Sequence, residues 1–469
     1  MSEHILFLTG HLAETRLRRV LAAMASAGFT AEVRNIGVKV AALMTPDIIR
    51  RRVGSLAGIT RIVLPGRCKG DLDALARDLG VPVQRGPEEI VDLPQYFGGT
   101  AKRRELSDHD CRIFAEIVEA SALEVAEIVA RAAALKAEGA DVIDLGCLPD
   151  TPFPHLEEAV RELKGRGWLV SVDSGDQEEL RRGARAGADF LLSLTEDRLE
   201  LAFETDAVPA LIPARHGELD GLLRGCERLA QAGRPFLADP ILDPIHFGFT
   251  ASIVRYHELR RRLPEVEMLM GVGNLTELTD ADTTGITMTL MGMVSELAIR
   301  NILVVQVSPH CRRAVAESEL ARRIMFAAKA DGSLPQGYDP GLMALRDRRP
   351  FLNTPEGIAA TAAEVGDANW RIEIAADGIH AYNRDGHHVA RGPFDIYPGL
   401  GVADDGSHAF YLGVELARAQ IALQLGKRYV QDNELRWGVA VPPPAEDRLH
   451  FVQAGSTLAE RRARRRREG

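Results

Sequence analysis

Short apolar runs that end in acidic or turn residues recur through the middle of the chain, and an amphipathic stretch follows each of them. The runs are DVIDLGC (Asp141–Cys147), WLVSVDS (Trp168–Ser174), FLLSLTED, VPALIPA, FLADPILDP, VEMLMGVGN and ILVVQVSPH. Apolar strands that alternate with helices are typical of a parallel sheet that is buried on both faces. About eight such units close into a TIM (β/α)8 barrel, so we expect this α/β fold.

Polar residues stand at the carboxyl ends of these predicted strands. They are Glu119, Asp144, Asp173, Asp239, Asp243, Asn274 and His310. In a TIM barrel, the residues at this end of the strands carry the chemistry. Their placement therefore predicts one functional site at the mouth of the barrel.

The composition indicates a globular enzyme. The chain has 469 residues, too many for one ordinary domain, of which 46% are apolar and 26% charged. A net charge of −10 argues against a general nucleic-acid surface, and no apolar run approaches the roughly 20 residues that cross a bilayer. The five cysteines are scattered without a CxxC pair, which disfavours a zinc site and favours a reducing cytoplasm. We therefore expect small-molecule partners, and neither nucleic acid nor a membrane.

Breaks in the pattern divide the chain into three domains and a tail. They are a Rossmann-like α/β domain (1–105), the barrel (106–335), a small α+β domain (336–445) and a tail (446–469). Gly10 and Gly66 follow strands in the first domain, but without GxGxxG spacing a turn role is favoured over phosphate binding. The arginine run of the tail favours a disordered, solvated segment over RNA binding.

In the third domain we expect two short strands, joined by a turn at Asn383–Gly386, and a helix over Ser407–Tyr429. Ser407 is the candidate N-cap of this helix. The apolar residues at helical spacing are expected to form its core face. They are Phe410, Val414, Ala417, Ile421 and Leu425.

Asp144 and Asp173 end two successive strands at matching points. A buried carboxylate must find hydrogen-bond donors or become protonated. A ligand with two adjacent N–H groups would satisfy such a carboxylate bidentately, much as arginine does. The alternative is that each aspartate caps the following helix or pairs with a buried arginine, and the two interpretations are about equally supported.

The last strands add further polar candidates. The sequence leaves open whether Asp239 or Asp243 points into the site. Asn274 can both donate and accept, which suits a heterocycle with a mixed edge. His310, Arg312 and Arg313 at a strand-to-helix turn are typical of an anion site, although both arginines could equally be solvated helix residues.

At these residues the chain resembles the dihydropteroate synthase superfamily. Over nearly its whole length, including GVGNLTELTDAD and SHAFYLGVELARAQIALQLGKRY, it is similar to the dihydropteroate synthase-related proteins of archaea and of bacteria that use tetrahydromethanopterin. The resemblance implies a TIM barrel of the dihydropteroate synthase type. It also implies a transferase that joins 7,8-dihydropterin-6-ylmethyl diphosphate to 4-(β-D-ribofuranosyl)aminobenzene 5′-phosphate in tetrahydromethanopterin biosynthesis.

The resemblance also implies roles for single residues. Asp173 and Asp239 would hold the pterin, with Asp243 competing for the second role and Asp144 at the acidic position of the second strand. From their own chemistry, and not from the resemblance, we expect His310 to assist catalysis and Asn274, Arg312 and Arg313 to bind substrate. Magnesium is the candidate cofactor with Glu119 as its candidate ligand, and a homodimer is the expected oligomer.

The chain also departs from the family's pattern. It lacks the family's lysine, since the seventh strand ends in Gly-Val-Gly-Asn274. The alternatives are therefore a non-catalytic pterin-binding or assembly protein of the same pathway and, with less support, a methyltransferase barrel.

Overall fold

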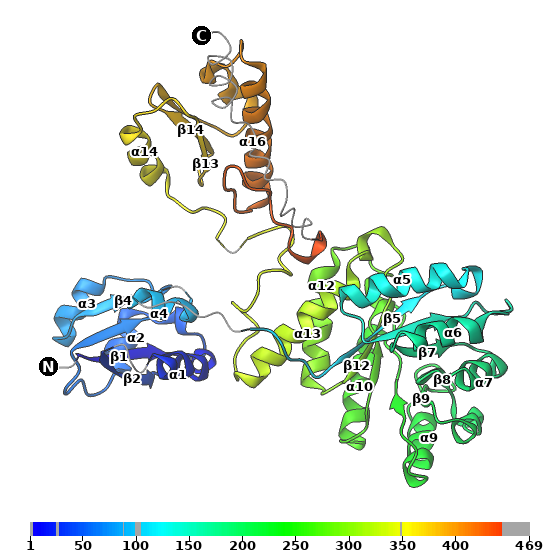
Figure 1. Ribbon diagram of the computed structural model, residues 1–469. Coiled ribbons are helices and arrows are strands. Elements are labelled where there is room, and N and C mark those ends of the chain that lie inside the picture. Colours follow the sequence, from blue (N-terminus) through cyan, green and yellow to red (C-terminus); the bar gives the residue numbers. More distant parts are fainter. Residues whose placement is uncertain (1–2, 25–27, 88, 99–104, 348, 443–469) are drawn as a thin grey trace. The chain divides into compact units, whose positions relative to one another are not determined.

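The computed structural model describes residues 3–24, 28–87, 89–98, 105–347 and 349–442 (Figure 1). The chain divides into two compact units, Met1–Asp339 and Pro340–Gly469. A four-stranded and an eight-stranded parallel sheet lie in the first unit, and a three-stranded antiparallel sheet lies in the second. The domain boundary expected at residue 105 stays a prediction, and the tail 446–469 lies outside the described residues.

The N-terminal sheet has the strand order β2-β1-β3-β4. Its strands are β1 Glu3–Thr9, β2 Phe29–Asn35, β3 Arg61–Leu64 and β4 Val83–Arg85, and its helices are α1 Glu14–Ala23, α2 Pro46–Arg52, α3 Leu72–Leu79 and α4 Leu93–Tyr96. After β1, the backbone N–H groups of His11 and Leu12 donate to the carbonyls of Val38 and Lys39. A methyl group at Gly10 would lie 2.7 Å from the Val38 carbonyl, so this glycine permits a close approach of two loops.

Eight parallel strands form the barrel in the order β10-β9-β8-β7-β6-β5-β12-β11. A parallel bridge between Ala238 and Met268 joins the two ends of this order and closes the ring. The strands are β5 Arg112–Ile117, β6 Val142–Gly146, β7 Leu169–Asp173, β8 Phe190–Leu194, β9 Val208–Leu211, β10 Leu237–Ala238, β11 Leu269–Gly271 and β12 Asn301–Val304. The predicted α/β barrel is thereby confirmed.

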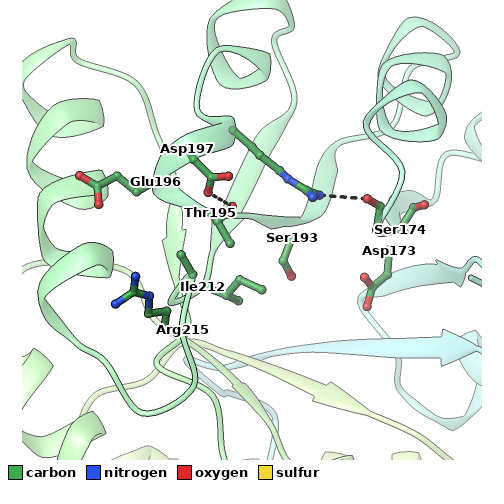
Figure 2. Close-up of a pocket in the computed structure, with 11 residues that line it drawn as sticks. Asp173, Ser174, Ser193, Thr195, Glu196, Asp197, Ile212 and Arg215 are labelled. Atoms are coloured by element: carbon green, nitrogen blue, oxygen red, sulfur yellow. Dashed lines mark hydrogen bonds between the residues drawn. The ribbon is translucent and has the colours of Figure 1, made fainter.

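Helices surround the strands of the barrel (Figure 1). They are α5 Val125–Glu138, α6 Leu156–Gly165, α7 Gln177–Arg185, α8 Leu201–Glu204, α9 Asp220–Gln231, α10 Phe249–Arg262, α11 Gly273–Thr276, α12 Thr283–Glu296 and α13 Ala314–Ala330. Local sequence sets their ends: the Asp176 carboxylate caps α7 by accepting from the Glu178 N–H at 2.8 Å. Gly139 ends α5 in the left-handed region with φ 115°. Figure 2 looks onto the loops that follow β7, β8 and β9.

An apolar cluster fills the inside of the barrel. Its buried members come from six strands: Phe114, Val142, Phe190, Leu192, Ala210, Leu237 and Leu269. Side chains alternate between the two faces of a strand, so the residue two places further along points inward as well. On three of these strands that next inward residue is acidic, and the apolar cluster therefore forms a floor beneath a set of carboxylates.

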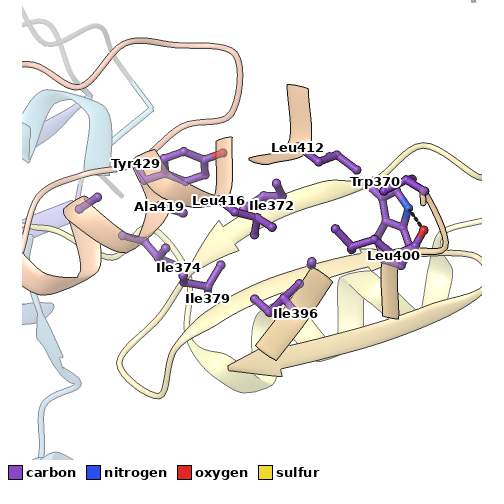
Figure 3. Packing of buried hydrophobic residues seen from close by; sticks show 13 residues of the cluster. Trp370, Ile372, Ile374, Ile379, Ile396, Leu400, Leu412, Leu416, Ala419 and Tyr429 are labelled. Carbon is purple, nitrogen blue, oxygen red and sulfur yellow. Dashed lines mark hydrogen bonds between the residues drawn. The ribbon is translucent and has the colours of Figure 1, made fainter. Parts of the chain in front are cut away.

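The second unit has three antiparallel strands where two were expected. They are β13 Arg371–Ile374, β14 Ile379–Asn383 and β15 Gly386–Ala390, packed with α14 Pro355–Glu364, α15 Pro393–Ile396 and α16 Gly406–Leu425. A tight turn, closed by backbone hydrogen bonds between Ala375 and Gly378, separates the first two strands. Trp370, Ile372 and Leu416 are buried in the core of this unit (Figure 3).

Two expectations for the long helix of this unit were wrong. Asp405 and not Ser407 caps α16, because the Asp405 carboxylate accepts from the His408 N–H at 3.1 Å. The face of α16 that is buried also differs from the expected one. Leu412, Leu416, Ala419 and Ala422 are buried, whereas the side chains of Phe410 and Ile421 are exposed. Among the described residues, no helix has the length and apolarity needed to span a membrane.

Candidate functional site

Four carboxylates gather at the mouth of the barrel. Glu116 lies on β5, Asp144 on β6, Asp173 at the end of β7, and Asp239 directly after β10. The register places Glu116 beside Asp144, and Asp173 beside Gly146. The backbone N–H of Asp239 donates to the Leu211 carbonyl at 2.8 Å and so extends the ladder by one residue. The parallel sheet thus brings together acids that are up to 123 positions apart in the chain.

Asp144 is the most deeply buried of the four, with 0% of its surface exposed. The Ser171 hydroxyl donates to Asp144 Oδ1 at 2.5 Å, whereas Oδ2 is buried and has no partner among the described residues. Burial raises the pKa of this carboxyl well above its ordinary range, and the charges of Asp173 and Glu116 raise it further. The Ser171 hydrogen bond acts in the opposite direction but is outweighed.

Asp173 and Glu116 also have raised pKa values. Burial, followed by the charges of Glu116 and Asp239, raises the pKa of Asp173 to about 7. Burial also raises the pKa of Glu116. Neither side chain forms an ion pair with any described residue, so the acids face one another without a counter-charge. At neutral pH this arrangement favours retention of a proton or the binding of a donor-rich ligand.

Asp239 and Asp243, which the sequence could not distinguish, lie in different environments. The Tyr256 hydroxyl donates to Asp239 Oδ1 at 2.6 Å and the Ile241 N–H donates at 2.7 Å, yet burial still raises the pKa of Asp239 to about 6. Asp243 is instead bound by Arg255 at 2.7 Å and by His216 at 2.8 Å. Burial alone would raise the pKa of Asp243, but these two partners lower it below its ordinary value. Asp239 therefore belongs to the acidic cluster, and Asp243 fixes the loop.

The other predicted residues are engaged around the loops after β11 and β12. The Asn274 amide donates to the Leu242 carbonyl at 2.9 Å, and a ring nitrogen of His310 lies 3.2 Å from the Thr276 carbonyl. Arg312 is exposed and donates to the Pro309 carbonyl at 3.0 Å. Arg313 pairs with Glu138 of α5. The structure therefore does not gather His310, Arg312 and Arg313 around the four acids as a free cationic site.

Glu119 lies beyond the end of its strand. β5 ends at Ile117, and Glu119 is exposed in the left-handed region with φ 55°. No group of three or more histidine, cysteine or acidic side chains suited to a metal ion occurs among the described residues. Glu119 thus lies apart from the four acids, and magnesium as a cofactor stays a prediction.

Glu116, three residues before Glu119, is the site residue that the sequence reasoning missed. The alternation of a strand predicts this residue, because Glu116 stands two places after the inward Phe114 in the run RIFAEI and so shares its face. The rule that site residues stand at strand ends favours Glu119 instead, because it looks like the last polar residue of the same run.

A cleft of about 680 Å³ opens beside Asp173, between the loops after β7, β8 and β9 (Figure 2). Asp173 and Ser193 lie on one side of it and Arg215 on the other. Arg198 donates to the Gly175 carbonyl at 3.0 Å, and the Thr195 hydroxyl donates to Asp197 at 2.6 Å. These two hydrogen bonds hold the loops at the edge of the cleft. The cleft gives a small molecule access to Asp173 from solvent.

The chain is similar to one family model and to one protein of an archaeon. Residues 3–88 match a family model described as a family of unknown function (DUF6513). An uncharacterized protein of Methanocaldococcus jannaschii is 26% identical, over 92% of this chain and 98% of its own length.

Solved structures similar in fold are dihydropteroate synthases. The enzyme of Yersinia pestis is 20% identical with a TM-score of 0.35, and that of Thermus thermophilus is 20% identical with a TM-score of 0.36. In both comparisons the match covers 48% of this chain and 95% of the other.

Proposed function

We propose that the barrel binds a pterin and joins it, as a dihydropteroate synthase-like transferase, to an arylamine. The observation that carries this proposal is the set of inward carboxylates, of which Glu116, Asp144 and Asp173 form no ion pair with any residue that the structure describes. A pterin presents its 2-amino group and the adjacent N3–H on one edge. These two donors match a carboxylate bidentately, in the manner of an arginine fork.

In this proposal Asp173 and Asp239 hold the pyrimidine ring of the pterin. Each has a raised pKa because burial penalises its charge, and N–H donors from a ligand would offset that penalty. The apolar floor beneath the acids excludes water from the inner face of the ring. Fixing the ring in this way would orient its 6-methylene group toward the mouth and lower the entropic barrier to attack by the amine.

The finer assignment is condensation of 7,8-dihydropterin-6-ylmethyl diphosphate with 4-(β-D-ribofuranosyl)aminobenzene 5′-phosphate, in tetrahydromethanopterin biosynthesis. It rests on the resemblance of the quoted motifs. The amine nitrogen would form the new C–N bond and lose a proton, while diphosphate leaves with the electrons of the broken C–O bond. A magnesium ion would then accompany the diphosphate as part of the substrate.

One observation favours a second candidate, a pterin-binding protein without turnover. Expulsion of diphosphate requires positive charge near the leaving group. Arg313, however, is paired with Glu138, and Arg312 is exposed and bound to a carbonyl of its own loop. Arg215 borders the cleft beside Asp173, and if it does not reach the diphosphate either, the chain would hold the ligand without reacting.

Two measurements on the full-length chain separate these candidates. Calorimetry with 6-hydroxymethyl-7,8-dihydropterin measures binding, and a diphosphate-release assay with both substrates and saturating magnesium measures turnover. Binding with turnover supports the transferase, whereas binding without diphosphate release supports the binding protein. Absence of pterin binding would overturn both.

A further inference from the structure

We propose that Glu116 is a third carboxylate contact in the pterin pocket, and that it makes the site selective for a reduced pterin over a fully oxidised one. The inference rests on the proposed function and specifies the oxidation state of the ligand.

Glu116 lies within reach of the same ligand as Asp173. On the strand between them, Gly146 is the register partner of Asp173, and a methyl group at Gly146 would collide with Oε1 of Glu116. The carboxylate of Glu116 therefore lies over the bare backbone of β6, on the side of the strand that faces Asp173. Asp173 lies two strands away, about 9.6 Å across the sheet, and the Glu116 side chain reaches over β6 toward it, so one bicyclic ligand can contact both carboxylates.

The carboxylate oxygens of this acidic cluster outnumber the hydrogen-bond donors that the described residues offer them. Asp144 is fully buried, and Ser171 satisfies only one of its oxygens; the other is without a partner among the described residues. Glu116 and Asp173 have no ion pair with any residue that the structure describes. A buried acceptor without a donor is costly, so this set of residues points to a ligand that brings N–H groups.

The number of N–H groups differs between the two oxidation states of a pterin. The 2-amino group and N3–H of either form can serve two carboxylates on the pyrimidine edge. The second ring of an oxidised pterin has only acceptor nitrogens, which an ionised carboxylate repels. A 7,8-dihydropterin has an N8–H and a tetrahydropterin adds an N5–H, so only a reduced ring offers Glu116 a donor.

The test compares two ligands on the full-length protein at pH 8, above the pKa of about 7 of Asp173. The ligands are 6-hydroxymethyl-7,8-dihydropterin and 6-hydroxymethylpterin, and the readout is the ratio of their dissociation constants from calorimetry. We expect the wild type to prefer the reduced ligand at least tenfold, which corresponds to about 1.4 kcal/mol. In Glu116→Gln the ratio should fall to about threefold or less, because the amide can also donate to an acceptor nitrogen.

Two further variants keep the test decisive. Gly146→Ala should lower the ratio without altering any acid, because it displaces the Glu116 side chain. Glu127→Gln, on the outer helix α5, removes a half-exposed carboxylate that pairs with Arg131 and should leave the ratio unchanged. An unchanged preference in both Glu116→Gln and Gly146→Ala would overturn the role of Glu116 while the proposed function stands. Failure of the wild type to bind either pterin would instead overturn the proposed function.

Discussion

The protonation of single side chains decides what the barrel mouth can bind. Asp173 and Asp239 have pKa values of about 7 and about 6, against an ordinary value of 3.8, because both are buried and because the charges of Glu116 and Asp239 act on Asp173 as well. Asp243 has a lowered pKa a few residues away, because Arg255 and His216 donate to it. The loop after β10 thus carries Asp239, whose carboxylate can bind a ligand, and Asp243, whose carboxylate stabilises the loop.

We predict that the ligand-free protein loses stability as the pH rises from 5 to 8. The unfolded chain releases the Asp173 proton near pH 4, whereas the folded chain releases it near pH 7. The folded state therefore binds more protons in this window, and the stabilisation present below pH 4 is lost as the pH rises through 7. We expect a loss of roughly 2 kcal/mol from Asp173, after allowing for solvent at the barrel mouth.

Urea unfolding of the wild type and of Asp173→Asn at pH 5 and pH 8 measures this effect, because the amide does not titrate. The two proteins should differ in their pH dependence by about the predicted loss, with the wild type relatively weaker at pH 8. Parallel pH profiles would contradict the raised pKa.

Asp173→Asn should also weaken binding of a dihydropterin at least about 100-fold, since a charge-assisted bidentate contact contributes roughly 3 kcal/mol. The fold should remain intact, because the change removes a charge and not volume. Calorimetry together with circular dichroism checks both parts. Retention of affinity within a few-fold would show that the aspartate is structural.

At the scale of elements, the periodicity of the sequence predicted the barrel well. Runs such as DVIDLGC and WLVSVDS became β6 and β7, because strands buried on both faces need apolar residues at every position. The polar contacts of the loops were harder to foresee. The choice between Asp239 and Asp243 depends on Arg255 of α10 and on His216 after β9, and no local pattern encodes a pairing between those elements.

The face of α16 shows another limit of local patterns. Two stripes of apolar residues run along this helix, and both have helical spacing. The structure buries the stripe that contains Leu412 and Leu416 against the sheet (Figure 3), and it leaves Phe410 exposed. Periodicity identifies an amphipathic helix, but contacts with distant strands select the buried stripe.

We predict that Asp243→Asn destabilises the loop after β10 by about 3 kcal/mol. The change leaves the Arg255 guanidinium, whose side chain is only 11% exposed, without its carboxylate partner. Chemical unfolding measures the loss. Glu200→Gln, which breaks an exposed pair with Arg228, is the matched control and should cost less than about 1 kcal/mol. Equal effects of the two substitutions would refute a structural role for Asp243.

At the scale of the whole molecule, two compact units each have a hydrophobic core of their own. The M. jannaschii relative aligns over 98% of its length, so the match spans both units.

Separate cores predict separate responses to mutation. Leu416→Ala in the second unit should lower its stability by about 2–5 kcal/mol, since Leu416 is 1% exposed. Pterin affinity should stay within about twofold of the wild type if the barrel holds the ligand by itself. Thermal unfolding and calorimetry on the same variant provide both readouts, and a large drop in affinity would imply that the second unit takes part in binding.

The most direct test of the central claim is a crystal structure of the full-length protein with 6-hydroxymethyl-7,8-dihydropterin. The account predicts electron density for a flat bicyclic ring at the barrel mouth, with its amino edge against the carboxylates of Asp173 and Asp239. A ring bound elsewhere, or one at the mouth that makes no contact with either carboxylate, would contradict it.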